Sequence, residues 1–157
     1  MSETKPVSIE TYFDLNVKTK QEAISKIGAY LADKGFVIDV DAFVADVFSR
    51  EDELPTYIGH NIGLPHSKSD HVKNAVVVVG RLNNPIIWNN DNQVDLIFLI
   101  AVPKKSAGDL HLKILAQLAR SLMHEDFRNG LRNLDSEEVK QLMYDNTALG
   151  SDTGGKL

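Results

Sequence analysis

The segments Ala75–Leu82 (AVVVVGRL) and Val94–Val102 (VDLIFLIAV) decide the fold of this chain. Both are rich in β-branched and aliphatic residues and are bounded by turn residues or proline, which predicts two β-strands. The second is apolar except for Asp95, as expected for a central strand that is covered on both faces. The polar cluster Asn89–Asn92 is expected to form a turn before it, and Pro85–Trp88 an edge strand. These strands should therefore form the centre of the core.

Two helices are predicted before the strands. The first begins at Thr19, which can form a capping box with Glu22, and it ends at Lys34-Gly35. The second has Asp39 or Asp41 as its cap and fades over residues 49–53. In both, apolar side chains recur at helical spacing, so each helix should bury one face.

Further helices are predicted after the strands. A buried stripe, capped by Ser106 or Asp109, is formed by His111, Ile114, Leu115, Leu118 and Leu122. A helical turn is expected around Phe127–Leu131, and a last helix over Ser136–Tyr144. Helices, then strands, then helices on one core predict an α/β fold with a mixed β-sheet sandwiched between α-helices.

The length of 157 residues fits a single domain. We expect a loose N-terminus over residues 1–6, the domain over 7–145 and a disordered tail over 146–157. The longest apolar run has seven residues, whereas a membrane span needs about 20, so direct membrane insertion is not expected. No signal peptide is visible, and a cytoplasmic location is the simplest interpretation.

Charge and cysteine content exclude several classes of function. Seventeen Lys and Arg against 22 Asp and Glu give a net charge of −5, which disfavours generic binding to nucleic acid. The chain has no cysteine, so disulfides, thiolate catalysis and Cys-based zinc sites are excluded.

Among five histidines, His66 and His111 are the candidates for chemistry. Residues 57–64 are expected to form a short strand, or two, with bends, and Pro65 to end the pairing because it lacks a backbone N–H. His66 would then stand exposed in a rigid position before the polar loop 67–69, which suits a nucleophile. His111 lies in the first turn of its helix, where the dipole favours an anion and disfavours imidazolium.

Two neutral histidines beside a helix N-terminus could hold a phosphoryl group covalently on imidazole. Phosphoryl transfer depends on positioning and charge stabilisation, and Arg50 is available to bind phosphoryl oxygens through its planar guanidinium. A zinc site from His60, His66 and His71 is an alternative, although the spacing matches no standard zinc pattern. His71 and His124 lie in polar segments and are interpreted as solvated residues.

Several stretches resemble the EIIA domains of the sugar phosphotransferase system, of the fructose/mannitol type, which include nitrogen-regulatory relatives. The family signature has Arg-Glu, then Ser/Thr-x-Ile-Gly, then Ile-Ala-x-Pro-His. The corresponding stretches here are Arg50-Glu51, Pro55–Gly59 (PTYIG) and Ile62–His66 (IGLPH). Asp109–Ala119 (DLHLKILAQLA) is similar to the second histidine helix of the family, and residues 21–37 match its helical opening. The resemblance covers residues 7–145.

The resemblance implies a mixed sheet flanked by helices and no metal or cofactor. It implies that His66 accepts a phosphoryl group from the histidine phosphocarrier protein HPr and passes it to a cysteine on an EIIB domain of a sugar permease. His111 would orient and charge-complement the phosphoryl group, and Arg50 and Thr56 would bind or brace it. The chain would then be a phosphotransferase component of the phosphoenolpyruvate-dependent system.

The sequence departs from the family pattern beside the site. Ser67 stands in place of the usual Gly, Gly63 in place of Ala, and His60-Asn61 follow Ile58-Gly59. These departures leave the identity of the sugar undetermined, whereas the residue types expected to carry the chemistry are retained. Two alternatives remain: a regulatory relative whose phosphorylation state controls a partner protein, and a degenerate binding module or His-metal enzyme.

Overall fold

The computed structural model describes residues 7–105 and 110–147. The caps expected at Ser106 or Asp109, the N-terminal segment 1–6 and the tail from residue 148 lie outside the described residues. The elements follow in the order β1 (Ser8–Leu15), α1 (Lys20–Asp33), α2 (Val40–Glu53), β2 (Ile62–Gly63), β3 (His66–Ser69), β4 (Val76–Asn89), β5 (Asn92–Pro103), α3 (Leu110–Ser121), α4 (Glu125–Asn133) and α5 (Ser136–Thr147).

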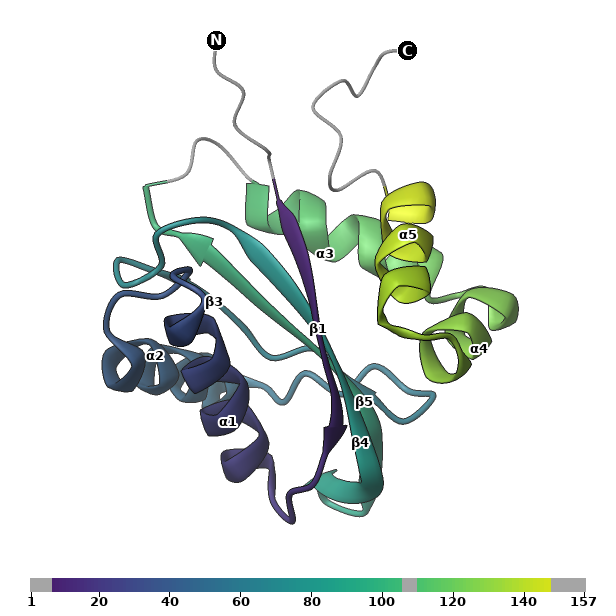
Figure 1. The fold of residues 1–157 in the computed structure, drawn as a ribbon. Coiled ribbons are helices and arrows are strands. Elements are labelled where there is room, and N and C mark those ends of the chain that lie inside the picture. The colour runs from purple at the N-terminus through teal and green to yellow at the C-terminus, as the bar shows by residue number, and fades with distance from the viewer. Residues whose placement is uncertain (1–6, 106–109, 148–157) are drawn as a thin grey trace, which may run out of the picture.

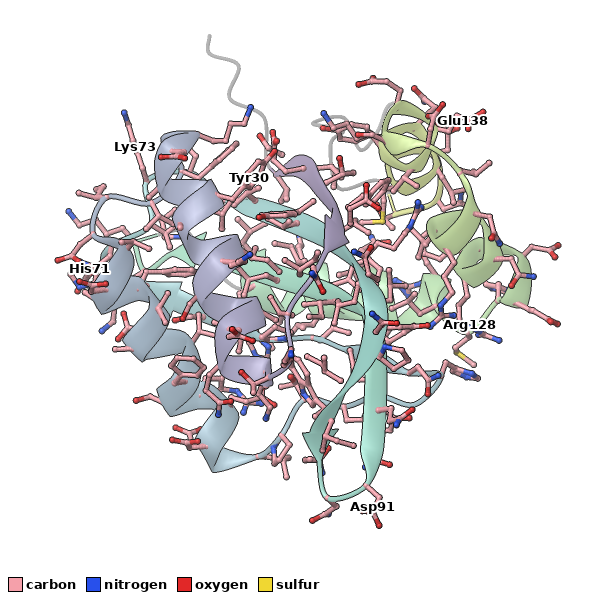
Figure 2. The ribbon with its side chains drawn as sticks, turned by 60° about the horizontal axis from the view of Figure 1, so that its bottom comes forward. Tyr30, His71, Lys73, Asp91, Arg128 and Glu138 are labelled. Atoms are coloured by element: carbon pink, nitrogen blue, oxygen red, sulfur yellow. The ribbon has the colours of Figure 1, made fainter. Side chains whose placement is uncertain are left out.

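The sheet is mixed, as the sequence predicts, and β5 pairs with β2, β3 and β4. The strand order is β1-β4-β5-β2, and β3 also pairs with β5. β1 is parallel to β4, β4 and β5 form an antiparallel hairpin, and β2 and β3 both run parallel to β5. Asp91 lies at the tip of the hairpin (Figure 2), which confirms the predicted turn.

The expected edge strand Pro85–Trp88 is not a separate strand. It is the second half of β4, which continues past an irregularity in its pairing with β5 between Arg81 and Ile86. A proline is tolerated there because the ladder is already interrupted, so its missing N–H breaks no pairing.

Helices cover both faces of the sheet (Figure 1). Leu96, Phe98 and Ile100 of β5 pack in one core cluster with residues of α3, α4 and α5. The alternate residues Ile97, Leu99 and Ala101 pack in a second cluster with α1 and α2. All six β5 side chains are fully buried, so β5 is the doubly covered central strand that its composition predicts.

The helix ends follow from local capping. Thr19 Oγ1 accepts a hydrogen bond from Glu22 N at 3.1 Å, and Asp39 Oδ1 accepts one from Ala42 N at 3.1 Å. Gly35 follows α1 with a φ of +85°, a conformation that glycine adopts without steric cost. Local chemistry therefore sets the ends of these helices, as the sequence predicts. No described helix is long and apolar enough to cross a membrane.

Two features of the ends of the domain were not predicted. β1 has no regular alternation of buried and exposed residues, and it forms through parallel pairing with β4. α5 continues to Thr147, two residues beyond the expected boundary, because the Thr147 side chain is buried and the Asn146 carbonyl accepts from Ser121 Oγ of α3 at 3.2 Å. Both depend on tertiary contacts that local patterns do not contain.

Candidate functional site

His66 is the first residue of a strand rather than an exposed residue before a polar loop. The expectation that pairing ends at Pro65 is wrong, because proline lacks the N–H but keeps a carbonyl, which accepts from Ile100 N at 3.0 Å. Pairing with β5 then continues from His66 to Ser69. Residue His66 is 5% exposed, since the sheet and its flanking helices enclose it.

Strand alternation divides the side chains of β3 between two helical layers. His66 and Lys68 are in register with Ile100 and Val102, whose side chains belong to the core cluster on the α3 side. Paired residues of adjacent strands point to the same face, so His66 and Lys68 point toward α3. Ser69 points the other way and donates from Oγ to Asp46 Oδ2 of α2 at 2.6 Å.

The hydrogen bonding of His66 fixes which ring nitrogen is reactive. Its Nδ1 lies 2.9 Å from the Leu64 carbonyl oxygen. A carbonyl can only accept, so Nδ1 carries the hydrogen and Nε2 carries the lone pair. The His111 ring lies with its centroid 5.4 Å away, at an interplanar angle of 41°. Nε2 of His66 is therefore the available nucleophile, beside a second imidazole.

Both imidazoles are held neutral at pH 7. Burial is the largest cause that lowers the pKa of His66, and Arg50 lowers it further, while the Leu64 carbonyl and Glu51 oppose the shift. The pKa of His111 is also lowered, first by burial and then by His66, Lys68 and Arg50. The sequence predicts that the helix dipole keeps His111 neutral. In the structure, burial is the main cause that lowers its pKa.

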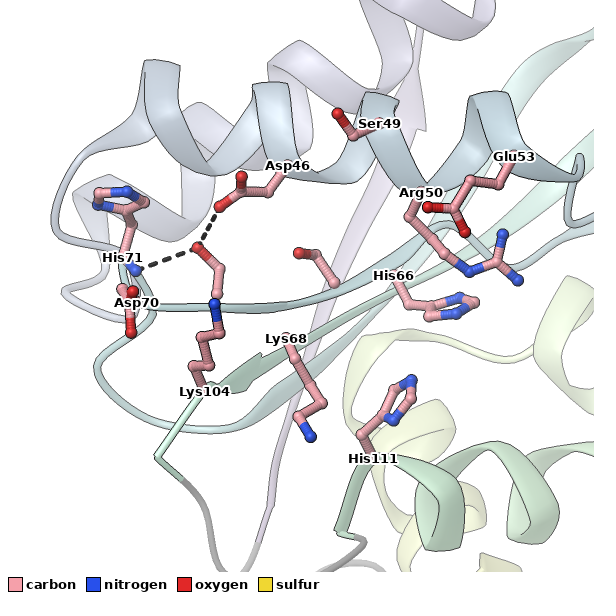
Figure 3. A pocket seen from close by; sticks show the side chains of 12 residues that line it. Asp46, Ser49, Arg50, Glu53, His66, Lys68, Asp70, His71, Lys104 and His111 are labelled. Carbon is pink, nitrogen blue, oxygen red and sulfur yellow. Dashed lines mark hydrogen bonds between the residues drawn. The ribbon is translucent and has the colours of Figure 1, made fainter.

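A cavity of about 410 Å³ opens at this site between α2, β3 and the start of α3 (Figure 3). Arg50 enters it from the last turn of α2 and donates from Nη1 to the Leu54 carbonyl at 3.1 Å. The structure thus brings together three of the four predicted site residues from separate elements. The lining residues are Asp46, Ser49, Arg50, Glu53, His66, Ser67, Lys68, Ser69, Asp70, His71, Lys104 and His111.

Thr56, the fourth predicted residue, is not among the lining residues. Its backbone N–H donates to Glu51 Oε2 at 2.9 Å, and its hydroxyl donates to Glu51 Oε1 at 2.6 Å. Glu51 is 3% exposed and also pairs with Lys20 Nζ at 3.1 Å. Thr56 therefore braces the segment after α2 through Glu51.

No role was predicted from the sequence for Glu51 or Lys68, although the spacing of each residue along its element indicates its position. Phe43, Val47 and Glu51 recur at intervals of four on α2, and all three are buried. An acidic residue on an apolar helical stripe indicates a buried, partnered carboxylate. Lys68 follows His66 by two positions, which places both on one face of a strand.

The other histidines do not join His66 and His111. The His60 carbonyl accepts from Arg132 Nη2 at 2.6 Å, and His60 does not line the cavity, whereas His71 lines its far end (Figure 3). His124 caps α4 without a side-chain hydrogen bond. Within residues 7–105 and 110–147, no group of three His, Asp or Glu side chains could hold a metal ion, so the alternative zinc site from His60, His66 and His71 gains no support.

Curated proteins of the sugar phosphotransferase system are similar to this chain. The fructose-specific EIIA component of Haloferax volcanii is 38% identical over 125 residues, which are 78% of this chain and 80% of that protein. Multiphosphoryl transfer protein 2 of Escherichia coli K12 is 39% identical over 95 residues, 60% of this chain. The match covers 11% of that longer protein, so it concerns one part of it.

Solved structures have the same fold. The nitrogen regulatory protein IIA-Ntr from Neisseria meningitidis superposes with a TM-score of 0.77 at 26% identity, over 85% of this chain and 92% of that one. Enzyme IIA-mannitol, in its complex with phosphorylated enzyme IIB-mannitol from Escherichia coli, has a TM-score of 0.73 at 24% identity, over 87% and 94% of the two chains.

The family model for the phosphoenolpyruvate-dependent sugar phosphotransferase system, EIIA 2, matches residues 7–146. This range contains β1 through α5 and every residue of the cavity described above. The chain therefore belongs to the EIIA 2 family of the sugar phosphotransferase system.

Proposed function

We propose that this protein is a phosphocarrier that accepts a phosphoryl group on His66 Nε2 from HPr and passes it to an EIIB domain of a sugar permease. The observation that carries the proposal is the neutral His66 ring. Its Nδ1 is engaged by the Leu64 carbonyl, and its free Nε2 lies beside His111 in an open cavity. Family membership supplies the reaction class.

In the accepting step, the lone pair of His66 Nε2 attacks the phosphorus of the phosphohistidine on HPr. The new N–P bond forms as the N–P bond of the donor breaks, and the donor imidazole leaves with the electron pair. His66 keeps its hydrogen on Nδ1, where the Leu64 carbonyl stabilises the positive charge that develops on the ring. A lowered pKa keeps the lone pair available at pH 7.

His111 and Arg50 stabilise the transferring group in this proposal. The guanidinium offers paired N–H donors to two phosphoryl oxygens, and the neutral His111 imidazole offers one N–H. Both side chains line the cavity around His66. Thr56 acts indirectly. Its hydroxyl and backbone N–H hold the carboxylate of Glu51, the residue that follows Arg50 in the chain. No metal or cofactor takes part.

In the onward step, a cysteine thiolate of the EIIB domain attacks the same phosphorus, and the His66 N–P bond breaks. The structural similarity to an enzyme IIA in complex with a phosphorylated enzyme IIB supports this partner. The proposed role places the protein in the cytoplasm. A regulatory output is the second candidate, because the fold also matches a nitrogen regulatory IIA protein. An assay of phosphoryl transfer to an EIIB domain distinguishes the phosphocarrier role from the regulatory role.

The proposal is tested by incubating the protein with the general phosphotransfer enzymes and labelled phosphoenolpyruvate, followed by measurement of protein mass. We expect one added phosphoryl group in the wild-type protein and in His71→Gln, which changes a histidine of the same cavity. His66→Gln should not be labelled, although its thermal unfolding stays cooperative. Full labelling of His66→Gln would disprove the assignment.

A further inference from the structure

Lys68 is a cation of the cavity for which the mechanism above has no use. It lies two residues after His66 on β3, and its side chain points to the same face. Two strand steps separate the two Cα atoms by roughly 6.6 Å, within reach of the four-carbon lysine stem. Figure 3 shows the Lys68 ammonium directed toward His111, on the opposite side of the cavity from Arg50.

Lys68 has no anionic partner in the described part of the chain. The ion pairs found there are Lys20 with Glu51 and Arg132 with Asp95, and no hydrogen bond from the ammonium is present. The side chain is exposed to solvent within the cavity. An unpaired cation directed toward His111, beside the reactive His66, is available to bind an anion there.

The charge of a phosphoryl group exceeds what Arg50 alone can match. A phosphoryl group carries close to two negative charges near pH 7. Glu53, three residues after Arg50 on α2, lies beside it in the cavity and reduces its positive field (Figure 3). The phosphorylated His66 ring is positive and His111 is neutral, so with Glu53 beside Arg50 a second cation on the α3 side would complete the neutralisation of the phosphoryl dianion.

We propose that Lys68 is a further phosphoryl-binding residue, whose ammonium contacts the oxygens of the group on His66 Nε2 from the side opposite Arg50. The inference rests on the proposed function and deepens it, because it adds a second cation to the site. The interaction of Lys68 with His111, one of the causes that lower the pKa of His111, fits this placement.

Lys104 is a matched control because it is an exposed lysine of the same cavity. It follows β5 and lies at the end of the cavity away from the two histidine rings (Figure 3). Its backbone N–H donates to the Ser69 carbonyl, which fixes it there. Replacing Lys104 removes the same charge from the cavity but not from the phosphoryl site.

The test compares the full-length wild-type chain with Lys68→Met, Lys68→Arg and Lys104→Met. Phosphorus NMR of the phosphorylated proteins measures the pKa of the phosphoryl group over pH 5 to 9. A contacting cation favours the dianion, so Lys68→Met should raise that pKa by about 0.5 to 1 unit. It should also slow phosphorylation by HPr by about 10- to 100-fold. Lys68→Arg should retain most of both effects, and Lys104→Met should match the wild type.

The possible outcomes separate the two proposals. If the phosphoryl pKa is the same in Lys68→Met as in the wild type, Lys68 does not contact the group. An equal shift in Lys104→Met would also overturn the inference, because it would indicate a diffuse field. If the general phosphotransfer enzymes do not label the wild type, the proposed function fails. Phosphoramidate, which phosphorylates imidazole directly with loss of ammonia, then provides the phosphoprotein for the same NMR comparison.

Discussion

Glu51→Gln tests whether a buried carboxylate holds the segment between α2 and β2 in place. The Glu51 side chain accepts three hydrogen bonds, from Lys20 Nζ, Thr56 N and Thr56 Oγ1. Glutamine has the same shape but offers one acceptor oxygen and a donor NH₂ group. At least one of the three donors then faces the NH₂ group without an acceptor, and the Lys20 ammonium, whose side chain is 14% exposed, loses its counter-charge.

The expected loss of stability follows from the burial of the pair. Removing one partner of a buried ion pair costs about 3 to 5 kcal/mol, because the remaining charge stays desolvated. The Lys20 ammonium lies 4.9 Å from the Trp88 ring, and this contact lessens the cost, so we expect about 3 kcal/mol. For a domain of this size, that loss lowers Tm by roughly 6 to 12 °C.

Urea unfolding and thermal melts of Glu51→Gln measure this loss. Asp95→Asn is the control, because it breaks the Asp95–Arg132 pair, whose side chains are 31% and 27% exposed. A partly exposed pair of this kind should contribute about 1 kcal/mol or less. Phosphorylation of His66 should also slow in Glu51→Gln, because Arg50 precedes Glu51 on α2. If both variants lost the same small amount of stability, the reasoning from burial would be refuted.

Four further predictions concern the site and its support. Arg50→Lys keeps the charge but loses the planar fork, so phosphotransfer should slow by about 10-fold in rate assays while urea unfolding stays near wild type. His111→Ala should slow transfer about 10- to 150-fold in the same assays, and a lowered Tm with unchanged rates would contradict its role. The pKa of His66 in the folded state is below its usual 6.5. As pH falls through 6.5, the unfolded chain therefore binds more protons than the folded chain does. The free energy of unfolding should therefore decrease from pH 7.5 to 5.5, and less steeply in His66→Gln. Gly63→Ala places a Cβ 2.8 Å from Trp88, so unfolding experiments should show a loss of about 1 to 3 kcal/mol.

The Gly63 position shows how a departure from the family pattern can have a structural cause. Where the family motif has alanine, this chain has glycine, and the space that a Cβ needs is filled by the Trp88 ring. Trp88 is 3% exposed and lies at the end of β4, more than 20 residues later in the chain. No local pattern reports that contact, so the sequence shows the departure and the tertiary structure supplies its reason.

The sequence by itself determined the central strands, the helices and the family resemblance of this protein. Apolar runs specify the first half of β4 and most of β5, because a strand covered on both faces is buried at nearly every position. Thr19 and Asp39 specify helix starts because a side-chain oxygen satisfies unpaired backbone N–H groups at short range. The motif around His66 likewise indicated a phosphohistidine family, since residue types and spacing suffice for that resemblance.

Only the tertiary structure decided the environment of His66. Its burial arises because β3 pairs with β5, whose partner residue Ile100 is 34 positions away, and because helices cover the sheet. The free Nε2, the lowered pKa and the placement of Lys68 opposite Arg50 all follow from that enclosure. Desolvation and charge interactions depend on distance in space, and the order of residues along the chain does not specify that distance.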